Sequence, residues 1–287
     1  MKLKSTLFLL LILVGWSKPD KTQAQNSLLW KIDHPQKKQT GYVFGTMHVI
    51  PKDRFKPSNT LDSLIKISDL VVTEIGLDLF LEERFDLATS MVFENKTNLE
   101  DYLPKDKMDR LKRVLIDTLG FEESRLQNQY FNLKPMFMST ILLTELIGPV
   151  EAYDLWVHKK ATEYEKEKGS LESVYNQIGF IDSIPMKTQL SWLDDLNSNL
   201  LEDYLDMLSV YESGDLDSLL IMSQEDPNTT ADFQLRTVRN KNWIPRMKRQ
   251  METGTVFFAV GALHLPGKDG VLELLKSEGY SVKPINQ

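Results

Sequence analysis

The chain has 287 residues, a formal net charge of −7 at pH 7 and no cysteine. The missing cysteine excludes disulfides, thiol nucleophiles and thiolate metal ligands. The negative charge disfavours binding to nucleic acid or anionic lipid, and the length suffices for one large domain.

The first 24 residues have the charge order of a secretory signal peptide. Lys2 and Lys4 precede an apolar run from Leu7 to Trp16, which is too short to span a bilayer, and a polar stretch follows. A membrane anchor is the competing interpretation, but a lipoprotein is excluded because no cysteine follows. We expect cleavage after Ala24, export to the periplasm or exterior of a bacterial cell, and no stable membrane insertion afterwards. Losing four lysines and one aspartate then moves the formal charge to −10.

Short apolar runs of strand type gather near both ends of the chain. A helical run with Ser58 as its N-cap lies between the second and third of these runs, and another helix ends at Gly279 between the last two. Such strand–helix–strand units predict parallel strands, so the two ends of the chain should meet in one sheet. The expected strands are residues 28–32, 42–46, 70–75, 255–260 and 280–285.

The middle of the chain has mostly helical periodicity. The segment 135–147 is apolar on nearly every side but only about thirteen residues long, which predicts a buried helix rather than a membrane one. We expect one α/β domain over residues 25–287, with a mostly parallel central sheet and a large helical lobe at about 100–250. The other expected helices are residues 104–120, 153–168, 173–182, 186–212, 215–224 and 229–250.

Two histidines follow predicted strands in the same arrangement. The stretches YVFGTMHVIP (42–51) and FFAVGALHLP (257–266) each place G-x-x-H after an apolar run, and Glu74 ends another strand. A glycine there is expected to allow a tight turn. Ligands collect beyond the carboxyl ends of parallel strands. A lone histidine there is more often structural, but the duplication favours a divalent metal site of His48, His264 and Glu74.

Other candidates support this centre. Arg239 could stabilise an oxyanion or contact substrate, and Asn240 could orient a ligand. The competing interpretation is a solvated basic helix face. Glu172 and Asp154 could hold the histidines through hydrogen bonds, or could simply cap helices.

The remaining signals narrow the choice of chemistry. His34 and His158 lie in polar segments and are expected at the surface. The chain has no G-x-S-x-G elbow and no H-E-x-x-H motif. The segment GALHLPGKD fails the phosphate-loop spacing and has Asp269 where Ser or Thr should bind magnesium, which excludes nucleotide binding there.

The chain resembles the TraB/PrgY/GumN family, and most closely its secreted GumN-like bacterial branch. The paired G-x-x-H motif, the strand-end glutamate, the RNKNW segment at 239–243 and the C-terminal AVGALHLPGKDGVLELLKSEGYSV carry the resemblance. YDLW, GSLESVYNQ and YESGDL extend it through the middle of the chain. The resemblance implies an α/β core with a helical insertion, distantly similar to the erythromycin esterase and ChaN haem-binding folds.

The related TIKI proteins imply a metalloprotease that uses manganese or cobalt and depends on His48, His264 and Glu74. We therefore expect an exported metal-dependent hydrolase acting on a peptide or small molecule, with manganese, cobalt or zinc as cofactor. Whether Glu74 is a ligand or a general base stays open. The alternatives are a non-catalytic haem- or peptide-binding protein that uses the same cleft, and an interaction module whose histidines merely pack.

Overall fold

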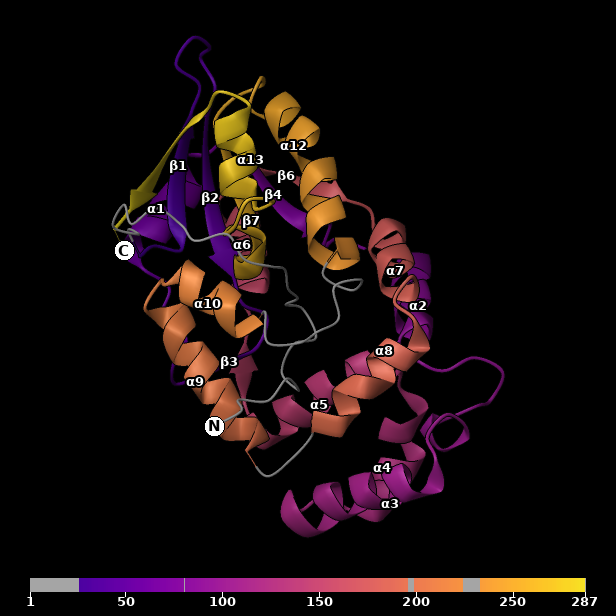
Figure 1. Cartoon of the computed structure of the whole chain (residues 1–287). Helices are drawn as coiled ribbons and strands as arrows, with labels where there is room; N and C mark the ends of the chain where they lie inside the picture. The colour runs from indigo at the N-terminus through magenta and orange to yellow at the C-terminus, as the bar shows by residue number, and fades with distance from the viewer. Residues whose placement is uncertain (1–25, 80, 196–198, 224–232, 287) are drawn as a thin grey trace.

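The computed structural model describes residues 26–79, 81–195, 199–223 and 233–286. The predicted signal peptide lies outside these residues. Among the described residues, the main sheet has six strands in the order β6-β4-β7-β2-β1-β8 (Figure 1). Their bounds are Leu29–Asp33 for β1, Thr40–Thr46 for β2, Leu70–Ile75 for β4, Glu167–Glu172 for β6, Val256–Gly261 for β7 and Ser281–Ile285 for β8.

The sheet is mostly parallel, as predicted. β7 lies between β2 and β4 and is parallel to both, and β6 is parallel to β4. Only β1 runs the other way, paired antiparallel with β2 and β8. In the register of β2 and β7, Thr46 faces Gly261, so the two G-x-x-H segments leave the sheet side by side. Strands from the two ends of the chain therefore do meet.

Helices cover both faces of the sheet. α1 (Asn59–Ile67) and α6 (Tyr153–Glu163) pack on one face, and α12 (Arg239–Gln250) and α13 (Val271–Ser277) on the other (Figure 1). Within β7, alternate side chains join the two separate cores. Because both faces are buried, β7 is a continuous apolar run rather than an alternating one.

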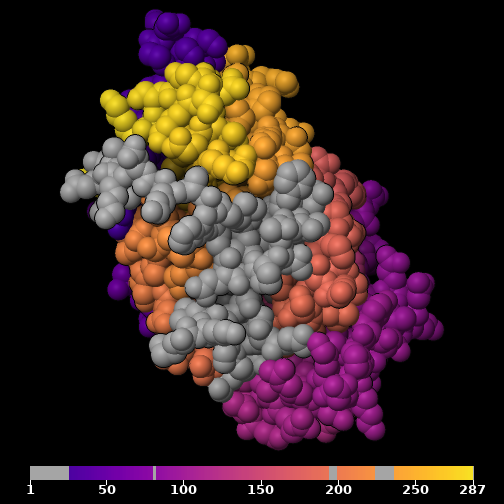
Figure 2. All heavy atoms as spheres, viewed as in Figure 1, coloured from indigo at the N-terminus to yellow at the C-terminus, as the bar shows by residue number. Residues whose placement is uncertain are grey.

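The remaining helices form a lobe beyond the carboxyl edge of the parallel strands (Figure 1). In the space-filling view, the part of this lobe that contains α3 and α4 lies at the end of the molecule opposite β8 (Figure 2). A short two-stranded sheet pairs β3 (Ile50–Pro51) with β5 (Val150–Glu151). The helices are α2 (Leu81–Ser90), α3 (Lys105–Arg113), α4 (Glu123–Asn128), α5 (Pro135–Ile147), α7 (Val174–Asp182), α8 (Met186–Ser191), α9 (Leu200–Glu212) and α10 (Leu216–Ser223).

The apolar helix α5 is an interior helix, as its length predicted. Met138 and Leu142 are fully buried, and Gly148 ends the helix with a positive φ of 86°. Within the described ranges, no helix has both the length and the apolar character needed to cross a membrane.

Two predicted helices differ from the structure. The segment 186–212 is not one helix, because a 3-10 turn at Trp192–Asp195 follows α8 and the chain re-enters helix at α9. That turn lets Trp192 and its neighbour Leu193 enter two different cores. The segment 153–168 is not all helix either, because Glu165 adopts a left-handed φ of 51° and the chain turns into β6.

Candidate active site at the carboxyl edge of the sheet

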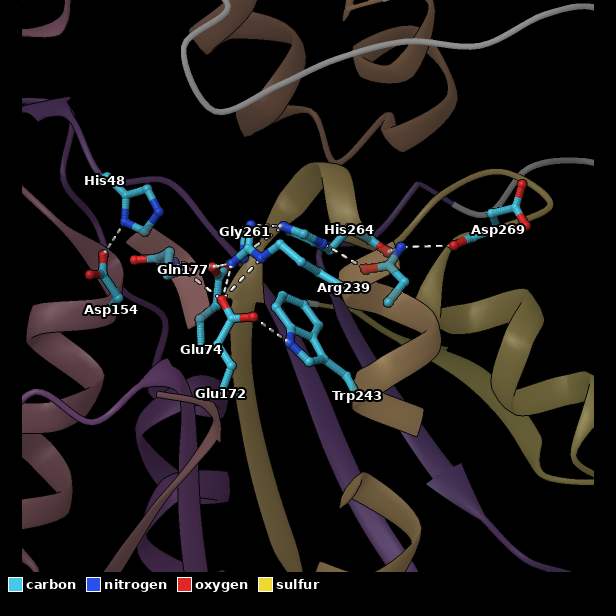
Figure 3. Close-up of polar contacts among 11 residues, drawn as sticks. His48, Glu74, Asp154, Glu172, Gln177, Arg239, Trp243, Gly261, His264 and Asp269 are labelled. Atoms are coloured by element: carbon cyan, nitrogen blue, oxygen red, sulfur yellow. Dashed lines mark hydrogen bonds and ion pairs between the residues drawn. The ribbon is translucent and has the colours of Figure 1, made fainter. Parts of the chain in front are cut away.

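Four neighbouring parallel strands each deliver one polar side chain to the same edge. Glu172 ends β6, Glu74 lies near the end of β4, His264 follows β7 and His48 follows β2 (Figure 3). His48, Glu74 and His264 line one cavity, and Nε2 of His264 lies 3.8 Å from Oε1 of Glu74. The structure thus brings together the three residues that the sequence proposed as metal ligands.

A buried arginine stands at the centre of this cluster. The guanidinium of Arg239, at the first turn of α12, donates to Oε2 of Glu74 at 2.5 Å and to Oε1 of Glu172 at 2.6 Å. Its Nη1 lies 3.2 Å from Nε2 of His264. Arg239 is only 2% exposed, so its side chain is part of the interior. The competing interpretation, in which Arg239 belongs to a solvated basic helix face, is wrong for this residue.

The two carboxylates beside Arg239 differ in charge preference. Burial favours a protonated Glu74, but Arg239, the histidines and the amide of Gly261 outweigh burial and lower its pKa to about 2. Burial is the stronger influence on Glu172 and raises its pKa despite Arg239. Glu74 is therefore the firmly ionised carboxylate of the pair.

The neutral state of His264 follows from its surroundings. Its Nδ1 donates to Oδ1 of Asn240 at 2.6 Å, and its ring lies 4.4 Å from that of Trp243. Burial, opposed by Glu74 but reinforced by Arg239, lowers the pKa of His264 to about 3. A hydrogen on Nδ1 leaves a lone pair on Nε2, which accepts from Arg239.

His48 is oriented by a carboxylate instead. Its Nδ1 lies 2.9 Å from Oδ1 of Asp154, in the first turn of α6. Burial favours the neutral ring, but Asp154 outweighs it and raises the pKa of His48 to about 9. Asp154 therefore forms a hydrogen bond with a histidine, which was one of the two predictions made for it.

Glu172 and Asn240 have supporting positions that the sequence described only in part. Glu172 does not cap α7, whose N-cap is Ser173, and it binds Arg239 and Nε1 of Trp243 rather than a histidine. Asn240 is fully buried, and its amide also donates to the backbone oxygen of Asp269 at 2.8 Å. Its contacts are those of a residue that orients His264.

The glycines of the two motifs are required by close packing. Neither Gly45 nor Gly261 has a positive φ. A Cβ on Gly45 would lie 3.0 Å from the Cα of Ala262, and one on Gly261 would lie 3.2 Å from Oε1 of Glu74. The backbone of Gly261 also donates to that oxygen at 2.7 Å. Close contacts therefore account for the demand for glycine at both positions without a positive φ.

The side chains at this edge match a divalent metal in kind. The Nδ1 atoms of His48 and His264 form hydrogen bonds with side-chain oxygen atoms, as is usual for a histidine that binds metal through Nε2. Glu74 adds a hard oxygen donor. In the described parts of the chain, no three such side chains are already grouped to hold an ion. Arg239 instead occupies Nε2 of His264 and Oε2 of Glu74, so a metal would have to replace those contacts.

Helices of the lobe close the cavity above this centre with apolar side chains. The apolar walls come from α5, α9 and α10, through Leu143, Met207 and Leu219. The empty volume is about 700 Å³ with its open mouth included. Two tyrosines of α9 fix this wall, because Tyr204 donates to the backbone oxygen of Val49 and Tyr211 to that of Gly45.

The other two histidines lie away from the site. His34 packs edge-on against Tyr280 with ring centroids 5.0 Å apart, and His158 pairs with Asp78 at 3.1 Å. Both are half-buried rather than fully solvated.

Sequence comparison identifies relatives along nearly the whole chain. The model of the TraB/PrgY/gumN family matches residues 28–284. Metalloprotease TIKI1 of Homo sapiens is 27% identical over 93% of this chain and 63% of its own length. Metalloprotease TIKI2 of Danio rerio is 22% identical over 93% of this chain and 62% of its own length. The chain thus spans somewhat under two thirds of these curated relatives, and no solved structure matches it.

Proposed function

The chain belongs to the TraB/PrgY/gumN family, and on that premise we propose that it is an exported, metal-dependent hydrolase of peptide-like bonds. The names of its relatives support a metalloprotease-like activity. The export rests on the predicted signal peptide, and the ligand set of His48, His264 and Glu74 rests on the geometry of the site.

One observation carries the proposal. The two imidazoles each have their Nδ1 atom held by an oxygen, and both line a cavity that the ionised Glu74 also lines. An active site for hydrolysis needs such oriented, partly desolvated groups. A structural histidine has no need of a second one from the opposite end of the chain.

The residues of the site divide the work. A divalent ion bound there would supply a water of lowered pKa and polarise a substrate carbonyl. Asn240 holds His264 in the tautomer that presents Nε2. Asp154 orients the His48 ring, whose Nε2 would release its proton when it binds the ion. Arg239 keeps Glu74 ionised, so Glu74 can act as ligand or accept a proton. To the guanidinium, once the ion has replaced its contact with Glu74, we assign the attraction of a carbonyl oxygen that gains negative charge.

Metal content and cleavage test the proposal together. The protein, loaded with manganese, cobalt or zinc and then desalted, is subjected to elemental analysis beside the His48→Ala, His264→Ala double variant and the His34→Ala control. We expect bound metal and metal-dependent cleavage of a peptide library in the wild type and the control, and neither in the double variant. Equal metal in all three proteins, or cleavage that persists in the double variant, overturns the ligand assignment.

A non-catalytic binding protein is the second candidate, favoured by the largely apolar cavity walls. Haem added to the protein would then give a shifted absorption band that disappears in the His48→Ala variant. Peptide turnover that needs metal would exclude this function as the main one.

A further inference from the structure

A second apolar cavity lies on the other side of the charged cluster. It is lined by α2, α5 and α7, for example by Leu87, Phe137 and Phe180. Its empty volume is also about 700 Å³ with open solvent included. Two apolar cavities therefore border the site, both walled by helices of the lobe.

The charged cluster separates the two cavities. Glu74 lines the first cavity and Arg239 lines the second. The two side chains form a hydrogen bond of 2.5 Å between Nη2 of Arg239 and Oε2 of Glu74. Thr140 of α5 lines both. A ligand that fills both cavities must therefore pass the polar groups with its own polar part between two apolar parts.

A residue that lines the first cavity carries a buried hydroxyl. Thr46, the last residue of β2, is only 3% exposed and lines the first cavity, and its Oγ1 has no hydrogen-bond partner among the residues that the structure describes. An unpaired buried hydroxyl costs free energy unless a ligand supplies the missing bond. Its position two residues before His48 places that bond next to the catalytic centre.

Resting on the proposed function, we propose that the substrate is an extended polypeptide segment with apolar side chains on both sides of the attacked bond. The main chain crosses the Arg239–Glu74 pair and receives a hydrogen bond from Thr46. The side chains before and after the bond enter the two cavities. A flat macrocycle such as haem fits less well, because its apolar surface is continuous while the two cavities are divided by charges.

Binding without cleavage tests this inference apart from the metal. Fluorescein-labelled hexapeptides with Leu-Leu, Asp-Leu, Leu-Asp or Asp-Asp at the two central positions are titrated by anisotropy in the presence of EDTA. We expect the Leu-Leu peptide to bind about tenfold more tightly than each single-Asp peptide, because an unpaired carboxylate in an apolar cavity is disfavoured.

Variants locate the two contacts. Thr140→Trp should weaken binding of the Leu-Leu peptide at least about tenfold by narrowing both cavities, whereas Thr144→Trp, one turn along α5 and outside both cavities, should not. Thr46→Val, which keeps the size of the side chain, should weaken it about fivefold, and Thr46→Ser should restore it. The thermal transition of each variant verifies folding.

The outcomes separate the inference from the proposed function. Equal affinity for all four peptides, or no binding of any, overturns the inference whatever the metal does. Unchanged affinity in Thr46→Val and Thr140→Trp overturns the assignment of these cavities. Selective binding without metal-dependent cleavage supports the inference on the substrate and overturns the proposed hydrolase function. Metal-dependent cleavage that does not depend on the two central residues supports the hydrolase function and overturns the inference.

Discussion

At the scale of single residues, the site is a balance of buried charges. Arg239 binds Glu74 and Glu172 at once, so one cation is shared by two carboxylates in a water-poor interior. The neutral His264 completes this arrangement, because a second cation next to Arg239 would be repelled. The site is therefore arranged for an ionised Glu74 and a neutral His264 at neutral pH.

This balance predicts that acidification lowers the stability of the fold, because the buried His264 resists protonation. Its pKa is about 3 in the folded state and 6.5 as the ordinary value, so between these values the unfolded chain binds a proton that the folded chain does not. The contribution of His264 is full above pH 6.5 and is lost as the pH falls toward 3. At pH 5 this loss is on the order of 2 kcal/mol.

Urea unfolding at pH 7.5 and pH 5 measures it. The free energy of unfolding should fall more in the wild type than in His264→Gln, and His34→Gln should behave as the wild type. Glu74, with a pKa near 2 against 4.5, loses its contribution mainly below pH 4.5. His48 titrates in both proteins and cancels from the comparison. An equal pH effect in the wild type and His264→Gln would contradict the neutral buried state.

At the scale of elements, the paired motif works through the contact of two strand ends. Gly45 of β2 lies against Ala262 and Leu265, the turn that follows β7. The sequence predicted the strands and both histidines because apolar runs and glycines mark them locally. The contact between the motifs is a tertiary fact with no local signal, so the glycines were first explained by backbone conformation.

A methyl group at Gly45 should therefore disturb the site more than its size suggests. Its Cβ would lie 3.0 Å from both the Cα of Ala262 and Cδ1 of Leu265, and the backbone atom cannot move away alone. We expect Gly45→Ala to cost about 1–3 kcal/mol of unfolding free energy. Gly179→Ala, in helix α7 with no atom within 4 Å, should instead gain up to about 1 kcal/mol. Thermal unfolding of the two variants measures these changes in stability. A Gly45→Ala variant as stable as the wild type would refute the close-packing explanation.

The elements that sequence reasoning missed share a cause. β6 reads EKGSLE, which is polar at its outer end because it is an edge strand with one neighbour, and its helix-like flank extended the predicted helix 153–168 over its first two residues. Because β6 was not predicted, the position of Glu172 beside Glu74 could not be predicted either. Arg239 was likewise undetermined, because a basic helix face and a buried cation have the same local pattern. A serine N-cap directly after Glu172 was the one signal that a strand ended there.

At the scale of the whole molecule, the fold makes the site depend on both ends of the chain. β2 from the first fifth and β7 from the last fifth lie side by side at its centre. The helical lobe then closes over their ends through α9, whose tyrosines bind the backbone of the β2 segment. A ligand that joins His48 to His264 would fasten the N-terminal part of the sheet to the C-terminal part.

Metal addition should therefore stabilise the entire fold rather than one loop. At a free metal concentration one hundred times the Kd, binding to the folded state alone adds about 2.7 kcal/mol. For a domain of this size about 1 kcal/mol moves Tm by about 2–4 °C, so we expect an increase of about 5–10 °C in calorimetry, reversed by EDTA. The His158→Ala control should keep the increase and the His48→Ala, His264→Ala double variant should lose it. Since unfolded histidines also bind zinc, manganese is the cleaner probe. An increase of the same size in the double variant would mean that the stabilising metal lies elsewhere, and the two imidazoles would then serve only as hydrogen-bond partners of Asp154, Asn240 and Arg239.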